Sequence, residues 1–180
     1  MKNEEDVLAF WFEEINPAQR WKKDEQFDNE IKSRFYETYQ AAAQCELFFW
    51  RATAKGRLAE VIVLDQFSRN MFRDLPQSFA ADPLALALSQ EAVALGMDKE
   101  LNQEERSFLY MPYMHSESLA VHEAAIPLFE SNGVQSNLDF EFKHKRIIER
   151  FGRYPHRNRI LGRESTADEI EFLSQPGSSF

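Results

Sequence analysis

Arginines, a histidine and an asparagine alternate with apolar residues in the stretch Arg150–Arg163, which reads RFGRYPHRNRILGR. Guanidinium groups bind carboxylates and phosphates, and an imidazole can transfer a proton near neutral pH. The segment from Lys143 to Arg163 carries a charge of about +7, while the remaining residues carry about −16 of the net −9. An anion is therefore expected beside this segment, either a ligand or the protein's own carboxylates.

Within this motif, Pro155 ends the preceding helix and Asn158 suits the N-cap of a short helix over 158–162. The first backbone amides of such a helix, together with His156 and Arg157, favour a bound carboxylate or phosphate. We interpret His156 as a candidate general acid or base, because the neighbouring arginines lower its pKa and keep it neutral near pH 7. The alternative is a packed histidine beside solvated arginines.

A second polar group follows the stretch Val61–Leu64, which could be read as a short buried strand. The surrounding sequence is too long for a strand and rich in helix formers, so we predict a helix over 57–73 with apolar residues nearly all round. Asp65, Arg69 and Arg73 stand four residues apart and form a polar stripe along it. Arg69 either lines a pocket and binds an anion, or joins helices through buried hydrogen bonds.

The third candidate group contains His115, Glu117 and His122. Two histidines seven residues apart can share a helix face, but metal sites favour closer spacing and a third ligand. We therefore predict neither a metal ion nor another cofactor, and interpret His115 and Glu117 as hydrogen-bonding groups in a pocket or at a helix start. Trp21 and Trp50 are expected in the core or in the wall of a cleft.

Composition limits the class of protein. A chain of 180 residues with 43% hydrophobic content predicts one domain over 1–180, with a flexible tail over 174–180. The acidic N-terminus lacks the features of a secretory signal, and no apolar run could span a membrane, so we predict a cytoplasmic protein. A pI near 5.0 disfavours nucleic acid as a partner. Cys45, in an apolar context, is expected to be a buried, inert thiol.

Helix signals recur along the chain, so we predict an all-α fold. The strand pattern of regular alternation with tight hairpins is missing from the sequence. The expected helices cover residues 4–14, 24–43, 57–73, 83–95, 103–110, 117–131, 137–151, 158–162 and 167–174.

Several helix starts carry capping signals. Asp82 precedes Pro83 at the start of a helix that ends before Gly96. In three further places a capping residue stands three positions before an acid, and these pairs are Asn102 with Glu105, Ser136 with Asp139, and Thr166 with Glu169.

Two similar segments, 90–95 and 122–128, begin 32 residues apart. This period suits stacked helical hairpins of the tetratricopeptide type, whose repeat is about 34 residues.

Motifs spread over nearly the whole chain carry a family resemblance. In order they are Phe10–Phe12, Arg20–Trp21, Phe27–Asp28, Arg57–Ala59, Leu64–Phe67, Arg69–Asn70, Phe108–Pro112, His115–Glu117, Tyr154–Asn158 and Leu161–Arg163. The sequence thereby resembles the bacterial family of domain of unknown function 924. The resemblance implies a tetratricopeptide-like helical fold and no known activity, so no catalytic residue is carried over. Ser68 stands where that family commonly has Pro.

These observations favour a site for a small anionic or phosphorylated molecule between the central helix and the C-terminal motif, with or without catalysis. Two alternatives remain open. The chain could be a module that holds a protein or peptide partner on a concave face, or the polar motifs could form a buried structural network. In the first hypothesis His156 transfers protons, and the ligand-binding residues are Asp65, Arg69, His115, Glu117, Arg157, Asn158 and Arg163.

Overall fold

The computed structural model describes residues 1–179, and every regular element in them is helical, as predicted. Five short 3₁₀ segments and two π-helical segments lie between or within the α-helices. The α-helices are α1 (Glu4–Ala9), α2 (Glu25–Ala43), α3 (Ala54–Ile62), α4 (Ser68–Met71), α5 (Asp82–Ala94), α6 (Gln103–Met114), α7 (Leu119–Asn132), α8 (Gln135–Phe151) and α9 (Ala167–Leu173).

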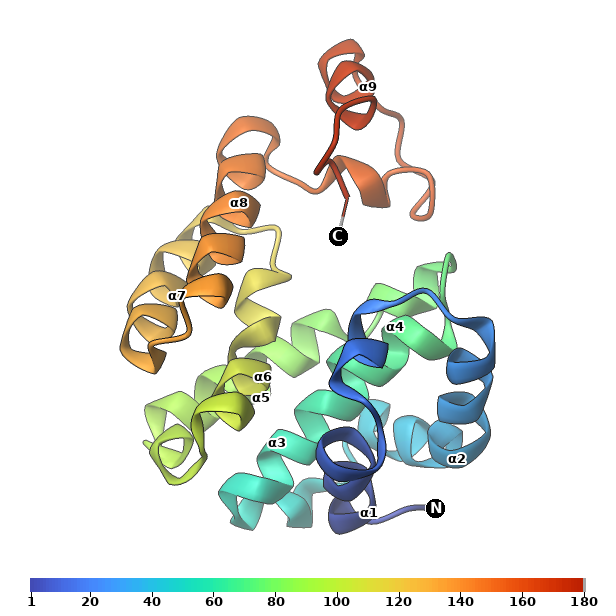
Figure 1. Cartoon of the computed structure of the whole chain (residues 1–180), viewed down its shortest axis with the longest axis vertical. Coiled ribbons are helices and arrows are strands. Elements are labelled where there is room, and N and C mark those ends of the chain that lie inside the picture. The colour runs from blue at the N-terminus through green and yellow to red at the C-terminus, as the bar shows by residue number, and fades with distance from the viewer. Residues whose placement is uncertain (180) are drawn as a thin grey trace.

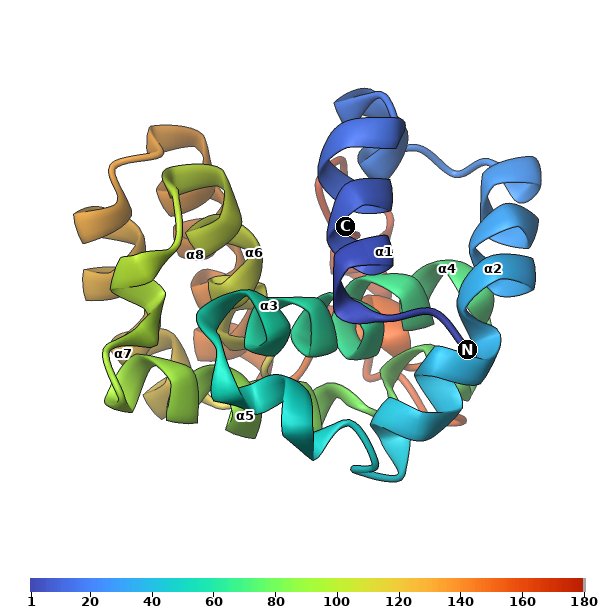
Figure 2. The ribbon, with the colours of Figure 1, turned by 90° about the horizontal axis from the view of Figure 1, so that it is seen from below.

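The predicted helix over 57–73 is a continuous helical run that begins earlier, at Ala54. It consists of α3, a π-helical segment over Val63–Phe67, and α4. The π segment shows that the helix departs from α geometry here although the chain has Ser68 rather than Pro. The Ser68 hydroxyl donates to the backbone oxygen of Leu64 at 2.6 Å. Figure 2 shows this run in the middle of the molecule, which agrees with its apolar surroundings on all sides.

Aromatic rings pack around the π segment. The ring of Phe67 lies 5.9, 5.5 and 4.7 Å from those of Phe10, Trp11 and Phe35. Trp11 continues the contact to Phe108 of α6, with ring centroids 5.7 Å apart. Because each buried aromatic side chain removes a large apolar area from water, this cluster fixes α2, α6 and the π-helical segment Phe10–Glu14, which continues α1, against the central run.

The later helices pack in chain order. Helices α5 and α6, α6 and α7, and α7 and α8 are neighbours, and α3 contacts α5 and α6. After α8 the chain turns back and crosses toward α4 before it reaches α9 (Figure 1). The sequential packing is compatible with helical hairpins, but a tetratricopeptide-like array stays a prediction.

The capping signals had mixed outcomes. Two capping boxes are confirmed, one between Asn102 and Glu105 and one between Thr166 and Glu169. The other two signals were wrong. At α5 the N-cap is Ala81, because the Asp82 carboxylate binds arginines instead, and α8 begins after Val134 without a side-chain cap.

The predicted helix over 158–162 is a series of turns, and the short 3₁₀ helix precedes it at Pro155–Arg157. The side chain of Asn158 does not cap a helix. It accepts from Arg163 Nε at 3.0 Å and donates to Ser165 Oγ at 3.1 Å and to Glu169 Oε2 at 3.2 Å. These contacts tie the turns to α9 and remove the predicted helix N-terminus as an anion site.

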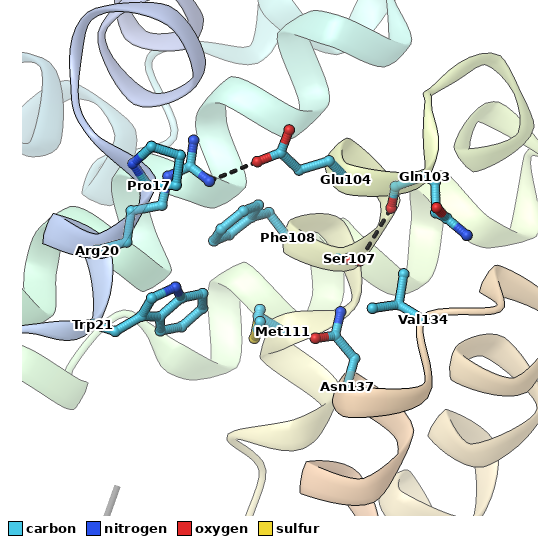
Figure 3. Close-up of a pocket in the computed structure, with 10 residues that line it drawn as sticks. All are labelled: Pro17, Arg20, Trp21, Gln103, Glu104, Ser107, Phe108, Met111, Val134 and Asn137. Carbon is cyan, nitrogen blue, oxygen red and sulfur yellow. Dashed lines mark hydrogen bonds and ion pairs between the residues drawn. The ribbon is translucent and has the colours of Figure 1, made fainter.

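One further expectation was wrong. Cys45 is exposed, because it takes the left-handed conformation (φ 59°) that ends α2 and turns its side chain away from the core. The two tryptophans agree with the expected core or cleft-wall positions, because Trp50 is buried and Trp21, although 65% exposed, is part of a pocket wall. Trp21 lies on the 3₁₀ segment Pro17–Trp21 and lines a pocket (Figure 3).

The C-terminal residues 174–179 form turns, and Ser178 is buried, with its hydroxyl donating to Leu173 O at 3.2 Å. Phe180, the last residue of the expected tail, lies outside the described residues. None of the helices within 1–179 has the length and apolar character that crossing a bilayer requires.

Candidate functional site

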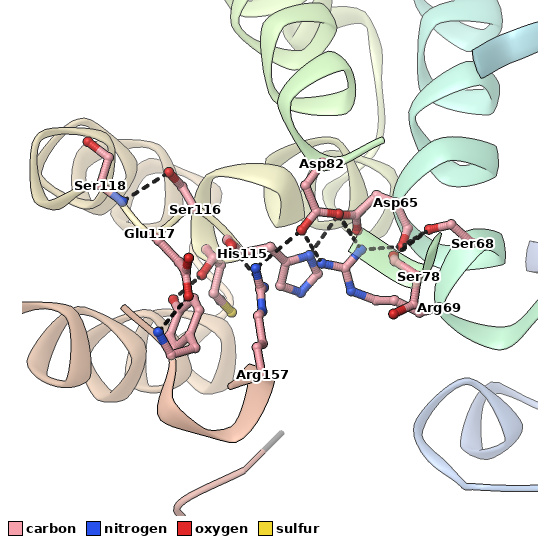
Figure 4. A network of polar contacts seen from close by, with 12 residues as sticks. Asp65, Ser68, Arg69, Ser78, Asp82, His115, Ser116, Glu117, Ser118 and Arg157 are labelled. Carbon is pink, nitrogen blue, oxygen red and sulfur yellow. Dashed lines mark hydrogen bonds and ion pairs between the residues drawn. The ribbon is translucent and has the colours of Figure 1, made fainter. Parts of the chain in front are cut away.

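Five polar side chains from five elements of the chain meet near the C-terminal end of α6, and we call them the Arg–His cluster (Figure 4). Asp65 comes from the π segment, Arg69 from α4 and Asp82 from the first position of α5. His115 is the C-cap of α6, and Arg157 ends the 3₁₀ helix that follows α8. The cluster therefore joins the central run to the C-terminal motif, as the sequence hypothesis required.

Asp65 and His115 form a carboxylate–imidazole pair, with Oδ1 and Nδ1 2.7 Å apart. Burial alone would raise the pKa of the fully buried Asp65, but the charge of Arg69 and the hydrogen bonds from His115 and Gln66 together outweigh burial and hold the pKa below its usual range. Burial and the same guanidinium lower the pKa of His115, so its ring is neutral at pH 7. An ionised carboxylate can only accept, so Nδ1 carries the hydrogen and Nε2 keeps its lone pair.

Arg69 is held by two carboxylates. It makes a two-pronged ion pair with Asp82, at 3.0 and 2.9 Å, and lies 3.2 Å from Asp65 Oδ1. Although burial disfavours its charge, these partners raise its pKa. Arg69 is thus permanently charged, and its bonds position Asp65 against His115.

Arg157 is also buried, but its positive charge is less well compensated than that of Arg69. Its Nη2 donates to His115 O at 2.9 Å, whereas its contact with Asp82 is long, at 3.4 Å. Its Nε is buried and has no hydrogen-bond partner within residues 1–179. Burial, followed by the charge of Arg69, lowers its pKa. The guanidinium also lies over the rings of Phe79 and Tyr154, at 4.5 and 4.8 Å, which supplies part of the missing stabilisation.

Glu117 and Arg163 form a separate clamp next to the Arg–His cluster. The Glu117 carboxylate accepts hydrogen bonds from both terminal nitrogens of Arg163, at 2.7 and 2.9 Å, and from the backbone N–H of Tyr154 at 2.7 Å. Arg163 also donates to Asn158 Oδ1 and to Tyr154 O. Burial would raise the pKa of Glu117, but these donors lower it. All three guanidinium nitrogens of Arg163 donate inside the fold, so this clamp holds the C-terminal segment.

His156 lies beside the cluster, with its ring 5.6 Å from that of Tyr154. Burial, and then the charge of Arg157, lower its pKa to about 4. The direction agrees with the sequence argument, although burial is the larger cause. The Asp65 carboxylate orients the His115 ring and fixes its tautomer, so His115 is well placed for proton transfer.

His115 and His122, the two histidines considered as metal ligands, lie in different environments. His122 lies fully buried between α7 and α8, where Nδ1 is 2.6 Å from Glu141 Oε1 and Nε2 is 2.8 Å from Ser116 O. The Tyr154 hydroxyl is 3.1 Å from Nε2. Within residues 1–179 no three side chains of the His, Cys, Asp and Glu types gather as metal ligands would.

Nearly the whole chain is similar to known proteins. The family model described as bacterial protein of unknown function (DUF924) matches residues 7–177. The chain belongs to the DUF924 family. It is also similar to a solved structure, a protein of unknown function, ATU0120, from Agrobacterium tumefaciens. That chain is 39% identical with a TM-score of 0.89, over 94% of this chain and 96% of the other. No curated protein matches the sequence.

In this DUF924 protein, four of the eight Lys and Arg side chains between Lys143 and Arg163 form ion pairs within residues 1–179. Arg153 pairs with Glu169 of α9 at 2.7 Å, and Lys145 pairs with Glu149 one turn away. With the clamp and the Arg157 contact, these pairs show that the protein's own carboxylates meet much of the charge that pointed to an anion. Arg73 also lies outside the cluster, because Asp28 of α2 binds it.

Sequence reasoning named four of the five members of the Arg–His cluster and missed their arrangement. Asp82 was assigned to a helix cap, and Asp65 and His115 are 50 positions apart, so no local pattern pairs them. One signal was available in the sequence. The polar stripe on the central helix contains one carboxylate, Asp65, for two arginines, so a further carboxylate had to come from another element.

Proposed function

We propose that the chain binds a small anionic or phosphorylated molecule at the Arg–His cluster. The supporting observation is the incomplete compensation of Arg157, a buried guanidinium whose Nε has no partner in the described chain and whose contact with the Asp82 carboxylate is 3.4 Å long. Native structures rarely leave such donors unused. A carboxylate or phosphate that replaced Asp82 at Arg157 would supply a shorter, charge-assisted pair, and Asp82 would keep both bonds to Arg69.

Catalysis is the finer part of this proposal. The Asp65 carboxylate fixes the His115 tautomer, and Nε2 of a neutral imidazole can accept a proton from a bound water or hydroxyl group. The His115 side chain is 16% exposed, so the ring is not sealed in the core. Two nearby guanidinium groups would stabilise negative charge that develops when the proton leaves.

Thermal unfolding in the presence of inorganic phosphate and a panel of phosphorylated and carboxylated metabolites tests the binding proposal. We expect a saturable rise of the midpoint in wild type. Arg157→Gln should abolish the rise, whereas Arg153→Gln, which removes an arginine paired with Glu169 outside the cluster, should retain it. A panel that moves no midpoint, or an equal rise in Arg157→Gln, contradicts an anion site at this cluster.

The alternative is a tetratricopeptide-like module that binds a protein or peptide. It is favoured by the sequential packing of α5 to α8 and by the exposure of Phe140 and Phe142 on α8. Phe140→Ser with Phe142→Ser should then release a partner that wild type retains through washing. A partner retained equally by this variant would argue against the face formed by α8.

A further inference from the structure

A pocket of about 300 Å³ lies away from the Arg–His cluster, between the 3₁₀ segment Pro17–Trp21, α6 and the start of α8 (Figure 3). We call it the Trp21 pocket. Its volume is at the lower end of the range for small-molecule sites. The residues that matter for its chemistry are Arg20, Trp21, Gln103, Glu104, Phe108 and Asn137.

Two aromatic rings form its walls. Trp21 and Phe108 are nearly parallel, with 15° between their planes and 6.0 Å between centroids. Trp21 is 65% exposed, whereas Phe108 is anchored in the core by Trp11. A large aromatic side chain left in water on a short 3₁₀ segment is unusual, and a stacked planar ligand would cover it.

The charges at the rim cancel. Arg20 donates from Nε and Nη2 to Trp11 O and from Nη1 to Glu104 at 2.6 Å, so the guanidinium and the carboxylate compensate each other. A strongly charged ligand would have to break this pair or remain unpaired. The Trp21 pocket therefore suits a ligand group that is neutral.

Most of the remaining polar groups are already used. Gln103 Nε2 donates to Asn132 O at 2.8 Å, and the Ser107 hydroxyl donates to Gln103 O at 3.0 Å. The side-chain amide of Asn137 has no partner within the described part of the chain. The amide oxygen accepts a hydrogen bond and the adjacent NH₂ group donates one. Together they can bind the edge of a planar ring that carries a donor next to an acceptor.

We propose that the Trp21 pocket binds a neutral heteroaromatic ring of the nucleobase type, stacked against Trp21 and held at its edge by the amide of Asn137. Stacking on an aromatic side chain supplies affinity for any base, and the amide selects rings with adjacent donor and acceptor atoms. The ligand is a free base or nucleoside, since a chain with net charge −9 repels a polyanion.

Fluorescence titration with adenosine tests the proposal on the intact chain. Trp11 and Trp50 are 0% and 2% exposed, so quenching by an added base reports on Trp21. With excitation at the red edge of the tryptophan band, adenosine should quench saturably. Purine riboside, which lacks the exocyclic amine that would donate to the Asn137 oxygen, should bind about tenfold more weakly.

Two variants complete the test by calorimetry. Asn137→Ala should weaken adenosine about tenfold and should no longer distinguish it from purine riboside, whereas Gln135→Ala on the same helix should leave binding unchanged. Trp21→Leu should abolish measurable binding while the melting curve shows a folded protein. The proposal is overturned if adenosine, guanosine, cytidine and uridine all fail to quench saturably, or if Asn137→Ala and Trp21→Leu bind as wild type does.

Discussion

Arg157 and Arg163 belong to the same motif but contribute differently to stability. Arg157→Met removes a charge that is poorly compensated and keeps an apolar stem, while Arg69 still pairs with Asp82. We expect its unfolding free energy to stay within about 1 kcal/mol of wild type. Arg163→Met leaves Glu117 half buried without its partner and should cost about 2 kcal/mol. Urea unfolding of both variants checks the order, and a larger loss for Arg157→Met would contradict it.

The titration of His156 makes a pH-dependent contribution. Burial and Arg157 lower its pKa from 6.5 to about 4, so the unfolded chain takes up the proton at a higher pH than the folded chain does. Protein stability must therefore fall as the pH drops from 6.5 toward 4, by up to about 3 kcal/mol from this group. His156→Gln should flatten urea midpoints measured across that window. An unchanged slope would show that His156 does not have a lowered pKa.

Candidate residues were identified from their types, but their roles depended on contacts that no local pattern reveals. Arg163 and Asn158 are typical of anion sites by composition, yet here they bind Glu117 and Glu169. Which partner an arginine finds is a tertiary property, because carboxylates distant in sequence compete for it. The lowered pKa of His156 was predicted from the charge of the adjacent Arg157, but the burial of His156, which is the larger cause, was not predictable.

At the scale of elements, the close approach of the 3₁₀ segment Phe48–Ala52 to α3 depends on one glycine. A Cβ at Gly56 would overlap the backbone oxygen of Trp50, which cannot move without unwinding that segment. Gly56→Ala should cost about 2–3 kcal/mol of unfolding free energy, although alanine favours helices. Gly96→Ala, at a φ of 72° with open space around it, should cost about 1 kcal/mol. Thermal and urea unfolding compare the two, and the reverse order would be evidence against the overlap.

Element positions were predictable where the signal is local. The capping boxes at α6 and α9 and the apolar surface of the central run act over one or two turns, so the sequence contains them. The turn over 158–162 was not predictable, because it depends on the contacts of Asn158 with α9, and the left-handed conformation of Cys45 was not predicted because the residue is not a glycine. The π segment that contains Asp65 was also not predicted, because its sequence was interpreted as part of a regular helix.

At the scale of the molecule, the C-terminal segment is fastened to the rest by contacts between residues far apart in the sequence. Glu117 of the α6–α7 connection binds Arg163 and the amide of Tyr154, and these bonds span 46 and 37 positions. Glu117→Gln should accelerate amide hydrogen exchange across 153–163 while α2 and α3 remain protected. Glu104→Gln, at the rim of the Trp21 pocket, is the matched control. Equal exchange in both variants would mean that other contacts hold the segment.

The buried contact between α7 and α8 has a spectroscopic consequence. Ser116 O can only accept, so His122 Nε2 carries a hydrogen, and the 2.6 Å contact between Nδ1 and Glu141 Oε1 must hold a second one. The side chains of His122 and Glu141, which hold these hydrogens, are fully buried. They should therefore survive transfer into heavy water for far longer than surface imidazole protons, and give separate far-downfield proton resonances that disappear only when α7 and α8 part.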